Sequence, residues 1–299
     1  TSECFPTPNS ILTEVSSVGM AVASSVGSGL CIGSSLFANF GLMTKILQNM
    51  RYMNLGVSRD LKNAFKTWST KVISFGKLSV DSKSHDLPFE FARYDVDPMF
   101  LVNYWTSLMT TLIGVGCFGF FHGIKFLLRE KLMKRKLVSS VMNFMILASF
   151  NFIIIQIYGT LDEIVLYSIL QLRFGEFSSG LSIASSILGI AFLLLGVSLL
   201  ILHFWIIYKY NKLKKQGNTE SLEKYLKRFE YFQALYQDFK DTTHLRHSYF
   251  AFLIIRAIIC NLIIVVLYEK PFTQAIMFMI INLLMIGLLI SKGPFKEIY

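Results

Sequence analysis

Long runs of apolar residues dominate the chain, and polar residues gather in the segments between them. A helix needs roughly 20 apolar residues to cross a hydrocarbon core about 30 Å thick. Five runs are of this kind: 99–124, 138–158, 181–208, 248–268 and 273–291. A sixth run, 12–33, is less apolar and contains one charged residue, Glu14, near its start. The pattern predicts an all-α, polytopic membrane bundle.

The segment 35–56 decides the orientation of everything after it, because Lys45 and Arg51 interrupt its apolar residues. Two topologies are open. Either 35–56 crosses the membrane as a seventh helix, or 12–49 forms one long helix that runs into the cytoplasm. We favour about seven crossings, with the N-terminus outside and the C-terminus inside. Arg51 then reaches the outer headgroups, and Lys45 needs a partner or water inside the bundle.

Lysine and arginine residues orient the predicted helices, because cytoplasmic loops carry an excess of them. The segment 125–136 contains six Lys and Arg residues, and 209–247 contains nine. Together with the tail 292–299, this side has seventeen, against nine on the side that includes 57–97. We therefore place 125–136 and 209–247 in the cytoplasm and 57–97 outside.

The predicted organisation follows from this topology. Residues 1–10 end an extracellular region, 11–56 form a first membrane pair, and 57–97 form an outer loop with a surface helix. Residues 98–208 form three membrane helices with the basic cytoplasmic loop 125–136, and 209–247 form a cytoplasmic amphipathic helix. Residues 248–291 form the last membrane pair, and 292–299 form a cytoplasmic tail. Cys4 precedes the first apolar run, so we expect disulfide-bonded repeats upstream. Cys31, Cys117 and Cys260 lie in apolar runs and are expected to be buried.

The composition agrees with a membrane protein. Hydrophobic residues make up 53% of the chain and charged residues 16%, whereas soluble domains carry about 25% charge. The net charge of +10 is explained by cytoplasmic loops, so it indicates no nucleic-acid partner. We expect contact with the bilayer, with anionic inner-leaflet lipids beside the basic loops, and with other membrane or surface proteins in a homo- or hetero-oligomer.

Small residues in the first predicted helix repeat at four-residue intervals, a spacing that lets neighbouring helices approach closely. Gly19, Ala23 and Gly27 form such a ridge, and Gly116 and Gly119 offer the same kind of contact. One interpretation is a sliding helix beside a pore. We favour the other, a tightly packed central helix.

The outer loop 57–97 contains an amphipathic segment, 61–75, which we expect to lie as a helix on the outer membrane surface. Farther along the loop, aromatic residues alternate with polar ones and predict a short extended piece through Phe89, Phe91 and Tyr94. Asp95 and Asp97 are weak evidence for a cation site, and we predict no metal site.

The cytoplasmic segment 209–247 contains one amphipathic stripe, formed by Leu222, Leu226, Phe229, Phe232, Tyr236 and Phe239. A helix with this stripe either lies along the inner leaflet or docks under the bundle. A calmodulin-type target helix is a third interpretation.

Charged residues inside membrane helices are functional candidates by default, and here they are Lys45 and Arg256. We expect Arg256 to pair with headgroups or with Asp238 or Asp241.

Three further polar residues lie in apolar runs. Asn261 and Asn282 are expected to hydrogen-bond between helices, and His203 is expected at the membrane interface. Motifs of serine or metal hydrolases and of nucleotide-binding enzymes are missing from the sequence. We predict no enzyme, no catalytic residue and no cofactor.

The C-terminal third combines an aromatic cytoplasmic helix, an arginine-containing membrane helix, an outer turn with Pro and Gln, and a Pro-Phe-Lys exit. These features are Tyr236, Phe239, Arg256, Pro271, Gln274, Pro294, Phe295 and Lys296. The combination resembles the TRP-like membrane domain of the polycystin and flavin-carrier type, in the variant that ends large ciliate cysteine-rich, growth-factor-receptor-like surface proteins. This resemblance implies cell or mating-type recognition at the plasma membrane, including its ciliary part.

The segment between the last two predicted helices argues against a conventional channel. Only about five residues, EKPFT, separate these helices, which is too few for a pore helix and a selectivity filter. We therefore predict a membrane anchor and scaffold of a large surface receptor. The alternative is a TRP- or polycystin-like cation channel subunit, and a lipid scramblase or transporter is a third interpretation.

Overall fold

The structure is a computed structural model, and it describes residues 49–53, 75–76, 78, 87–127, 136–217, 219–235 and 243–292. Every regular element within these residues is a helix. Five of the helices are long and apolar enough to cross a membrane. They are α5 (Phe100–Leu127), α7 (Lys136–Phe174), α8 (Gly180–Lys215), α11 (Tyr249–Val266) and α12 (Pro271–Lys292). The predicted all-α class is confirmed, and the five long apolar runs overlap these five helices.

Shorter helices lie between the long ones or before them. They are η1 (Met50–Tyr52), α4 (Phe89–Ala92), α9 (Thr219–Arg228), η2 (Glu230–Leu235) and α10 (His244–His247). The ridge of Gly19, Ala23 and Gly27, the residue Lys45 and nearly all of the segment 61–75 lie outside the described residues.

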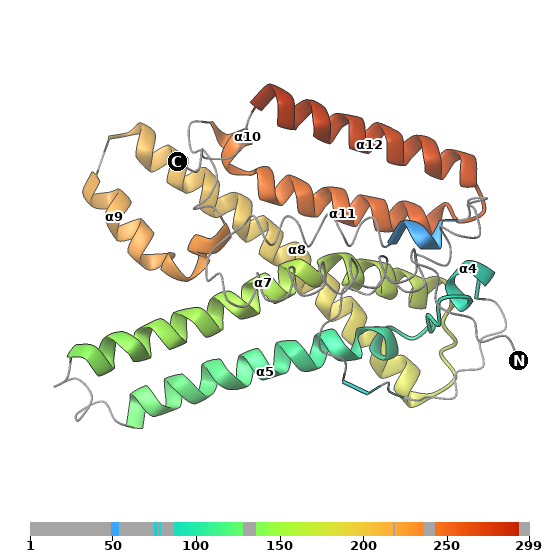
Figure 1. The fold of residues 1–299 in the computed structure, drawn as a ribbon, viewed down its shortest axis with the longest axis horizontal. Coiled ribbons are helices and arrows are strands. Elements are labelled where there is room, and N and C mark those ends of the chain that lie inside the picture. Colours follow the sequence, from blue (N-terminus) through green and yellow to red (C-terminus); the bar gives the residue numbers. More distant parts are fainter. Residues whose placement is uncertain are drawn as a thin grey trace, which may run out of the picture.

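Helix α7 is the centre of the bundle, because it contacts α5, α8, α11 and η2. Helices α5 and α7 run side by side, α8 crosses α7, and α12 packs along α11 at the edge away from α5 (Figure 1). Helices α7 and α8 diverge beyond their crossing, and α9 lies between their separating ends (Figure 1).

The bundle has two ends. At the turn end lie η1, α4 and the connections 175–179 and 267–270 (Figure 1). At the opposite, basic end lie α9, α10 and the last residues of α5, α8 and α12 (Figure 1). The described parts of 125–136 and 209–247 therefore share one end, as the charge pattern requires.

Glycine residues allow α8 and α5 to approach α7 closely. A Cβ atom added at Gly196 would collide with the Leu161 side chain, and one at Gly114 would lie 2.9 Å from Cδ1 of Phe152. Gly116 and Gly119 are different, since the space around them is open within 4 Å. The expectation that these two glycines mediate close helix contact is not met among the described residues, because α7 packs on the Gly114 side of α5.

Large apolar side chains cover the outside of the bundle. On α12, Leu284 is 64% exposed and Ile290 is 79% exposed, and on α5 Phe126 is 78% exposed. Such surfaces are stable when they face lipid, so the bundle is suited to contact with the bilayer. Cys117 on α5 is also exposed, contrary to the expectation that it is buried, whereas Cys260 is buried as expected.

The predicted amphipathic stripe of 209–247 is broken into two short helices. Helix α8 continues through the lysines to Lys215, α9 ends at Arg228, and η2 follows. Phe229 contacts the Trp205 ring of α8 with centroids 5.7 Å apart, and Phe232 contacts the Phe150 ring of α7 at 5.5 Å. The break directs aromatic side chains at both diverging helices. Tyr236 and Phe239 lie outside the described residues.

The expected extended piece at 89–94 is wrong, because Phe89–Ala92 form the helical turn α4. This turn places the Phe91 ring against Tyr52, with centroids 5.2 Å apart, and against Tyr268 at 5.7 Å. Partial burial raises the pKa of the Tyr268 phenol above its usual value. The aromatic contacts join η1, α4 and the α11–α12 connection at the turn end.

Asp97 stabilises the start of α5. Its Oδ1 accepts from the backbone N–H of Met99 at 2.8 Å, and its own N–H donates to Asn103 Oδ1 at 3.0 Å. Groups of three or more metal-ligating side chains are missing from the described residues. Asp97 therefore acts as a helix-start residue of α5.

Candidate functional site: a buried polar cluster and a capped helix end

Two adjacent carboxylates, Asp162 and Glu163, are buried in the middle of the bundle. They are 1% and 7% exposed. The predicted membrane helix 138–158 stops before them, but α7 continues to Phe174. Because polar residues within a membrane span are costly and usually serve function or assembly, Asp162 and Glu163 are the leading candidates for a functional site.

Asp162 belongs to a triangle of hydrogen bonds that joins three segments. Asn49, before η1, donates from Nδ2 to Asp162 Oδ2 at 3.3 Å and to Asn261 Oδ1 at 3.1 Å. Asn261, on α11, donates from its own Nδ2 to the backbone carbonyl of Asp162 at 2.9 Å. The expected interhelical hydrogen bonding of Asn261 is confirmed, and its partner is α7.

Glu163 connects α7 to α5. Ser107 Oγ donates to Glu163 Oε2 at 2.8 Å. One turn away, the hydroxyls of Tyr104 and Thr160 lie 3.0 Å apart and share a hydrogen bond. We call Asn49, Tyr104, Ser107, Thr160, Asp162, Glu163 and Asn261 the polar cluster.

The polar cluster lies at the level of the apolar stretch of α8. Leu161, beside Asp162, packs on Gly196, and Tyr158 Oη donates to the Leu199 carbonyl at 2.8 Å. Both α8 residues are near the middle of the run 181–208. The cluster is therefore buried within the candidate spans, where its carboxylates are suited to hold a proton or attract a cation.

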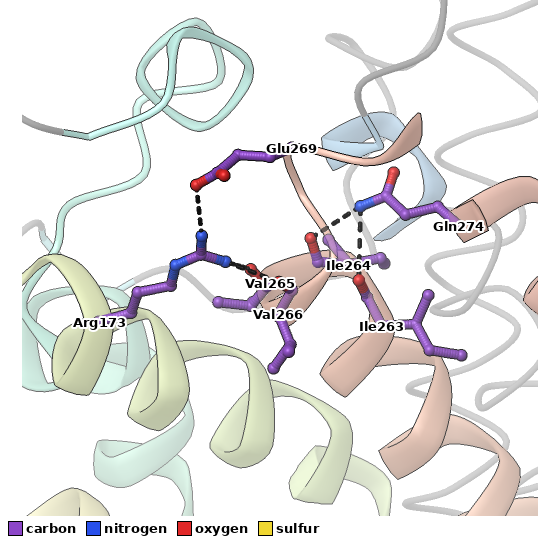
Figure 2. Close-up of polar contacts among 7 residues, drawn as sticks. All are labelled: Arg173, Ile263, Ile264, Val265, Val266, Glu269 and Gln274. Carbon is purple, nitrogen blue, oxygen red and sulfur yellow. Dashed lines mark hydrogen bonds and ion pairs between the residues drawn. The ribbon is translucent and has the colours of Figure 1, made fainter. Parts of the chain in front are cut away.

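A second polar feature lies at the turn end, where α11 stops (Figure 2). The last carbonyls of an α-helix have no partner within the helix. In α11, Ile263 O still accepts from the backbone N–H of Leu267 at 3.0 Å, so the carbonyls that need other donors begin at Ile264. Gln274 of α12 donates from Nε2 to Ile264 O at 3.0 Å and to Ile263 O at 3.4 Å. Arg173 of α7 donates to Val266 O at 2.9 Å and also to Val265 O. Side chains from two other helices thus cap the carbonyls of Ile264, Val265 and Val266. Gln274 adds a second donor at Ile263 O.

Arg173 also binds the connection between α11 and α12. Its Nη2 lies 2.8 Å from Glu269 Oε1, with the two side chains 29% and 79% exposed. Arg173 lies between the predicted membrane runs 138–158 and 181–208 in the sequence, whereas the structure places it in the last turn of α7. The helix continues there because its polar side chains find partners on neighbouring helices.

Gln171, one turn before Gly175, joins the starts of α5 and α8. Its Oε1 accepts from the Phe100 N–H and from Ser185 Oγ, each at 2.8 Å, and its Nε2 donates to Ser182 O at 2.8 Å. The first turns of α8 contain several serines, so Gln171 contacts them by hydrogen bonds rather than by apolar packing. The three contacts fix the turn end of α7 between α5 and α8.

Arg256 has a different described partner from those expected. Its Nε donates to Asn282 Oδ1 of α12 at 3.1 Å. The expected interhelical role of Asn282 is confirmed, and Asp238 and Asp241 lie outside the described residues. His203 faces the inside of the bundle: it is 1% exposed and lies between the rings of Tyr158 and Phe250, at 5.7 and 6.1 Å.

Sequence reasoning missed Asp162, Glu163, Arg173 and the capping role of Gln274. A signal was available for the carboxylates, since apolar residues continue after Glu163 through 164–170. A polar interruption with apolar residues on both sides is typical of a long membrane helix with a buried site.

Comparison of the chain with protein-family models, with curated proteins and with solved structures finds no match.

Proposed function

We propose that this chain is the multi-pass membrane anchor and scaffold of a larger cell-surface recognition or receptor protein. The observation that carries the proposal is the closed connection between α11 and α12. Only residues 267–270 join these helices, and the carbonyls at the end of α11 are capped by Arg173 and Gln274. A pore helix and a filter need a longer loop. The connection therefore favours a membrane anchor over an ion pathway between these two helices.

Hydrogen bonds between helices also favour a stable anchor. The polar cluster ties α5, α7, α11 and η1 together through amides and hydroxyls, and Gln171 ties in α8. In lipid, apolar surface gives little drive for helices to associate, so packing and hydrogen bonds hold a bundle together. A domain of this kind keeps an attached ectodomain in the membrane.

The topology and cellular place of the anchor are part of the proposal. We place the N-terminus outside, the C-terminus inside and seven crossings in the plasma membrane. The supporting observation is the shared basic end of the described loops (Figure 1). The resemblance to ciliate mating-type and TRP-like domains adds the expectation that the attached ectodomain recognises another cell.

The anchor proposal is tested with a reporter domain fused ahead of Thr1 and expressed in cultured cells. We expect a membrane-impermeant antibody to stain intact cells, and we expect the fusion to stay with membranes in alkaline carbonate. The double variant R173A/Q274L should lower the amount of reporter at the surface, whereas K270Q, an exposed neighbour, should not. A reporter that carbonate extracts, or that is stained only after permeabilisation, would refute the proposal.

One observation favours a second candidate, a TRP- or polycystin-like cation channel subunit. Asp162 and Glu163 are carboxyl side chains buried between α5, α7 and α11, and rings or pairs of carboxylates favour cations in conducting pathways. This candidate requires that D162N change cation permeability when the reconstituted chain is studied in planar bilayers. A current that is identical in D162N and the parent chain would leave the carboxylates as assembly residues.

A further inference from the structure

Helix α8 changes from apolar to basic near its last turns. Trp205 and Tyr208 are 44% and 58% exposed, and exposed Lys209 and Lys212 follow them directly. Exposed aromatic residues followed by lysines are typical of the boundary between hydrocarbon and headgroups. This part of α8 therefore lies at headgroup level in the proposed anchor.

Helix α9 docks on the same part of α8 by its apolar face. Tyr225 is 6% exposed, and its Oη donates to the Ile206 carbonyl at 2.9 Å. Phe229 packs on the Trp205 ring at 5.7 Å. Because the bundle occupies this face, insertion into lipid or capture by a calmodulin-type groove would require α9 to detach. The charged face of α9 is the one left outward.

Lys209 is held where α8 and α9 meet. Its Nζ lies 5.0 Å from the Trp205 ring centroid and 5.9 Å from that of Tyr225. Cations are attracted to aromatic faces at this range, so the side chain is pre-positioned while remaining exposed to a ligand.

The neighbouring charges extend this positive surface. Lys227 and Arg228 are exposed in the last turn of α9. Lys224 is paired with Glu220 at 2.7 Å and contributes less. Residues 209–235 contain seven Lys and Arg residues against three Glu residues.

We propose that the α8–α9 junction, formed by Trp205, Tyr208, Lys209, Lys212, Lys227 and Arg228, binds anionic phospholipid headgroups. The lysines and Arg228 contact phosphate, with Lys209 at the centre, and Trp205 and Tyr208 contact the glycerol and upper acyl region. Lipid is the source of this phosphate because the two exposed aromatic residues place the junction beside the bilayer. The inference rests on the proposed membrane-anchor function and assigns that anchor a lipid-selective surface.

The test uses the full chain in neutral detergent micelles and measures binding by thermophoresis. The probes are dioctanoyl phosphatidylinositol bisphosphate and, as the neutral lipid, dioctanoyl phosphatidylcholine. We expect tighter binding of the anionic lipid, weakened by added salt. K209Q and K212Q should each weaken it about fivefold, since a basic residue near an anionic surface contributes about that factor. K270Q, at the turn end, should bind like the parent chain.

Three results would overturn the inference. Equal binding of the two lipids would show that the chain does not select the anionic headgroup. Equal effects of K212Q and K270Q would show that the α8–α9 junction is not the binding site. Free inositol trisphosphate that binds as tightly as the lipid would make a soluble phosphate the ligand. K212Q, whose residue takes no part in the ring contacts of Lys209, keeps the test decisive if K209Q disturbs the fold. The reporter experiment is independent of lipid binding. If the reporter is anchored but the chain binds both lipids equally, only the lipid-binding inference is refuted.

Discussion

Arg173 and Gln274 cap the same helix from two different neighbours. Arg173 reaches the end of α11 from α7 and Gln274 reaches it from α12 (Figure 2). Together they bind the carbonyls of Ile264, Val265 and Val266, which lie in the last turn, where a helix supplies no internal donors. An unpaired backbone carbonyl is costly away from water. The pair therefore allows α11 to end against the bundle and turn at once into α12.

Replacing Arg173 by alanine removes the cap from Val265 and Val266 and the ion pair with Glu269. We expect R173A to lower the free energy of unfolding by about 1.5–3 kcal/mol, the range for hydrogen bonds from a charged group. E269Q should cost less than about 1 kcal/mol, because Glu269 is 79% exposed and exposed ion pairs contribute little. Thermal unfolding of the purified chain in micelles measures both, and equal losses would contradict the capping role.

Gln274 is fully buried, so its replacement should lower stability, because the carbonyls that it binds lose a hydrogen-bond donor. We expect Q274L to destabilise the chain by about 1–3 kcal/mol despite the apolar replacement, because Ile263 O and Ile264 O lose a donor. T273A, one residue earlier on the exposed side of α12, is the matched control and should change stability by less than about 0.5 kcal/mol. A Q274L variant as stable as T273A would show that the cap is dispensable.

Asn261 both donates and accepts in the triangle with Asn49 and Asp162. N261L leaves Asn49 Nδ2 with one bond fewer and the Asp162 carbonyl without this donor, and we expect a loss of about 1–3 kcal/mol in chemical unfolding. L262V changes the adjacent, partly lipid-facing residue and should be nearly neutral. The triangle has no role in stability if the two variants unfold at the same denaturant concentration.

Gly196 and Gly116 offer a matched pair of Gly-to-Ala substitutions. At Gly196 the added methyl group collides with Leu161, so we expect G196A to destabilise by about 1–3 kcal/mol through overpacking. At Gly116 none of the residues that the structure describes comes within 4 Å of an added methyl group. G116A should therefore be neutral or stabilising by up to about 1 kcal/mol, because alanine favours helix. Melting temperatures (Tm) of the two proteins check this, and a harmful G116A would indicate that another helix packs there.

The helical class and the five long apolar helices were predictable from hydropathy, because bilayer thickness fixes the length of an apolar run. The polar half of α7 was not predictable in this way. Gly159, Thr160 and Asp162 look like the end of a span when only their own polarity is considered. They remain in a helix because α5 and α11 supply hydrogen bonds to Thr160 and Asp162, and such partners are distant in sequence.

The partners within the site were harder to predict than the residues themselves. Arg256 is recognisable as a charge in an apolar run, but its contact with Asn282 depends on how α11 pairs with α12. His203 resembles an interfacial residue by its position near the end of an apolar run, yet the rings of Tyr158 and Phe250 bury it. In each case tertiary packing decided the outcome.

Ion flux through the full chain distinguishes an anchor from a channel, since the two differ in conductance. The chain is reconstituted in liposomes that contain a potassium- or sodium-sensitive dye, with protein-free liposomes as the reference. For an anchor, we expect the flux to equal that of protein-free liposomes, and we expect D162N to leave it unchanged. A cation flux that scales with the amount of protein and changes in D162N would contradict the account and establish the buried carboxylates as part of a pathway.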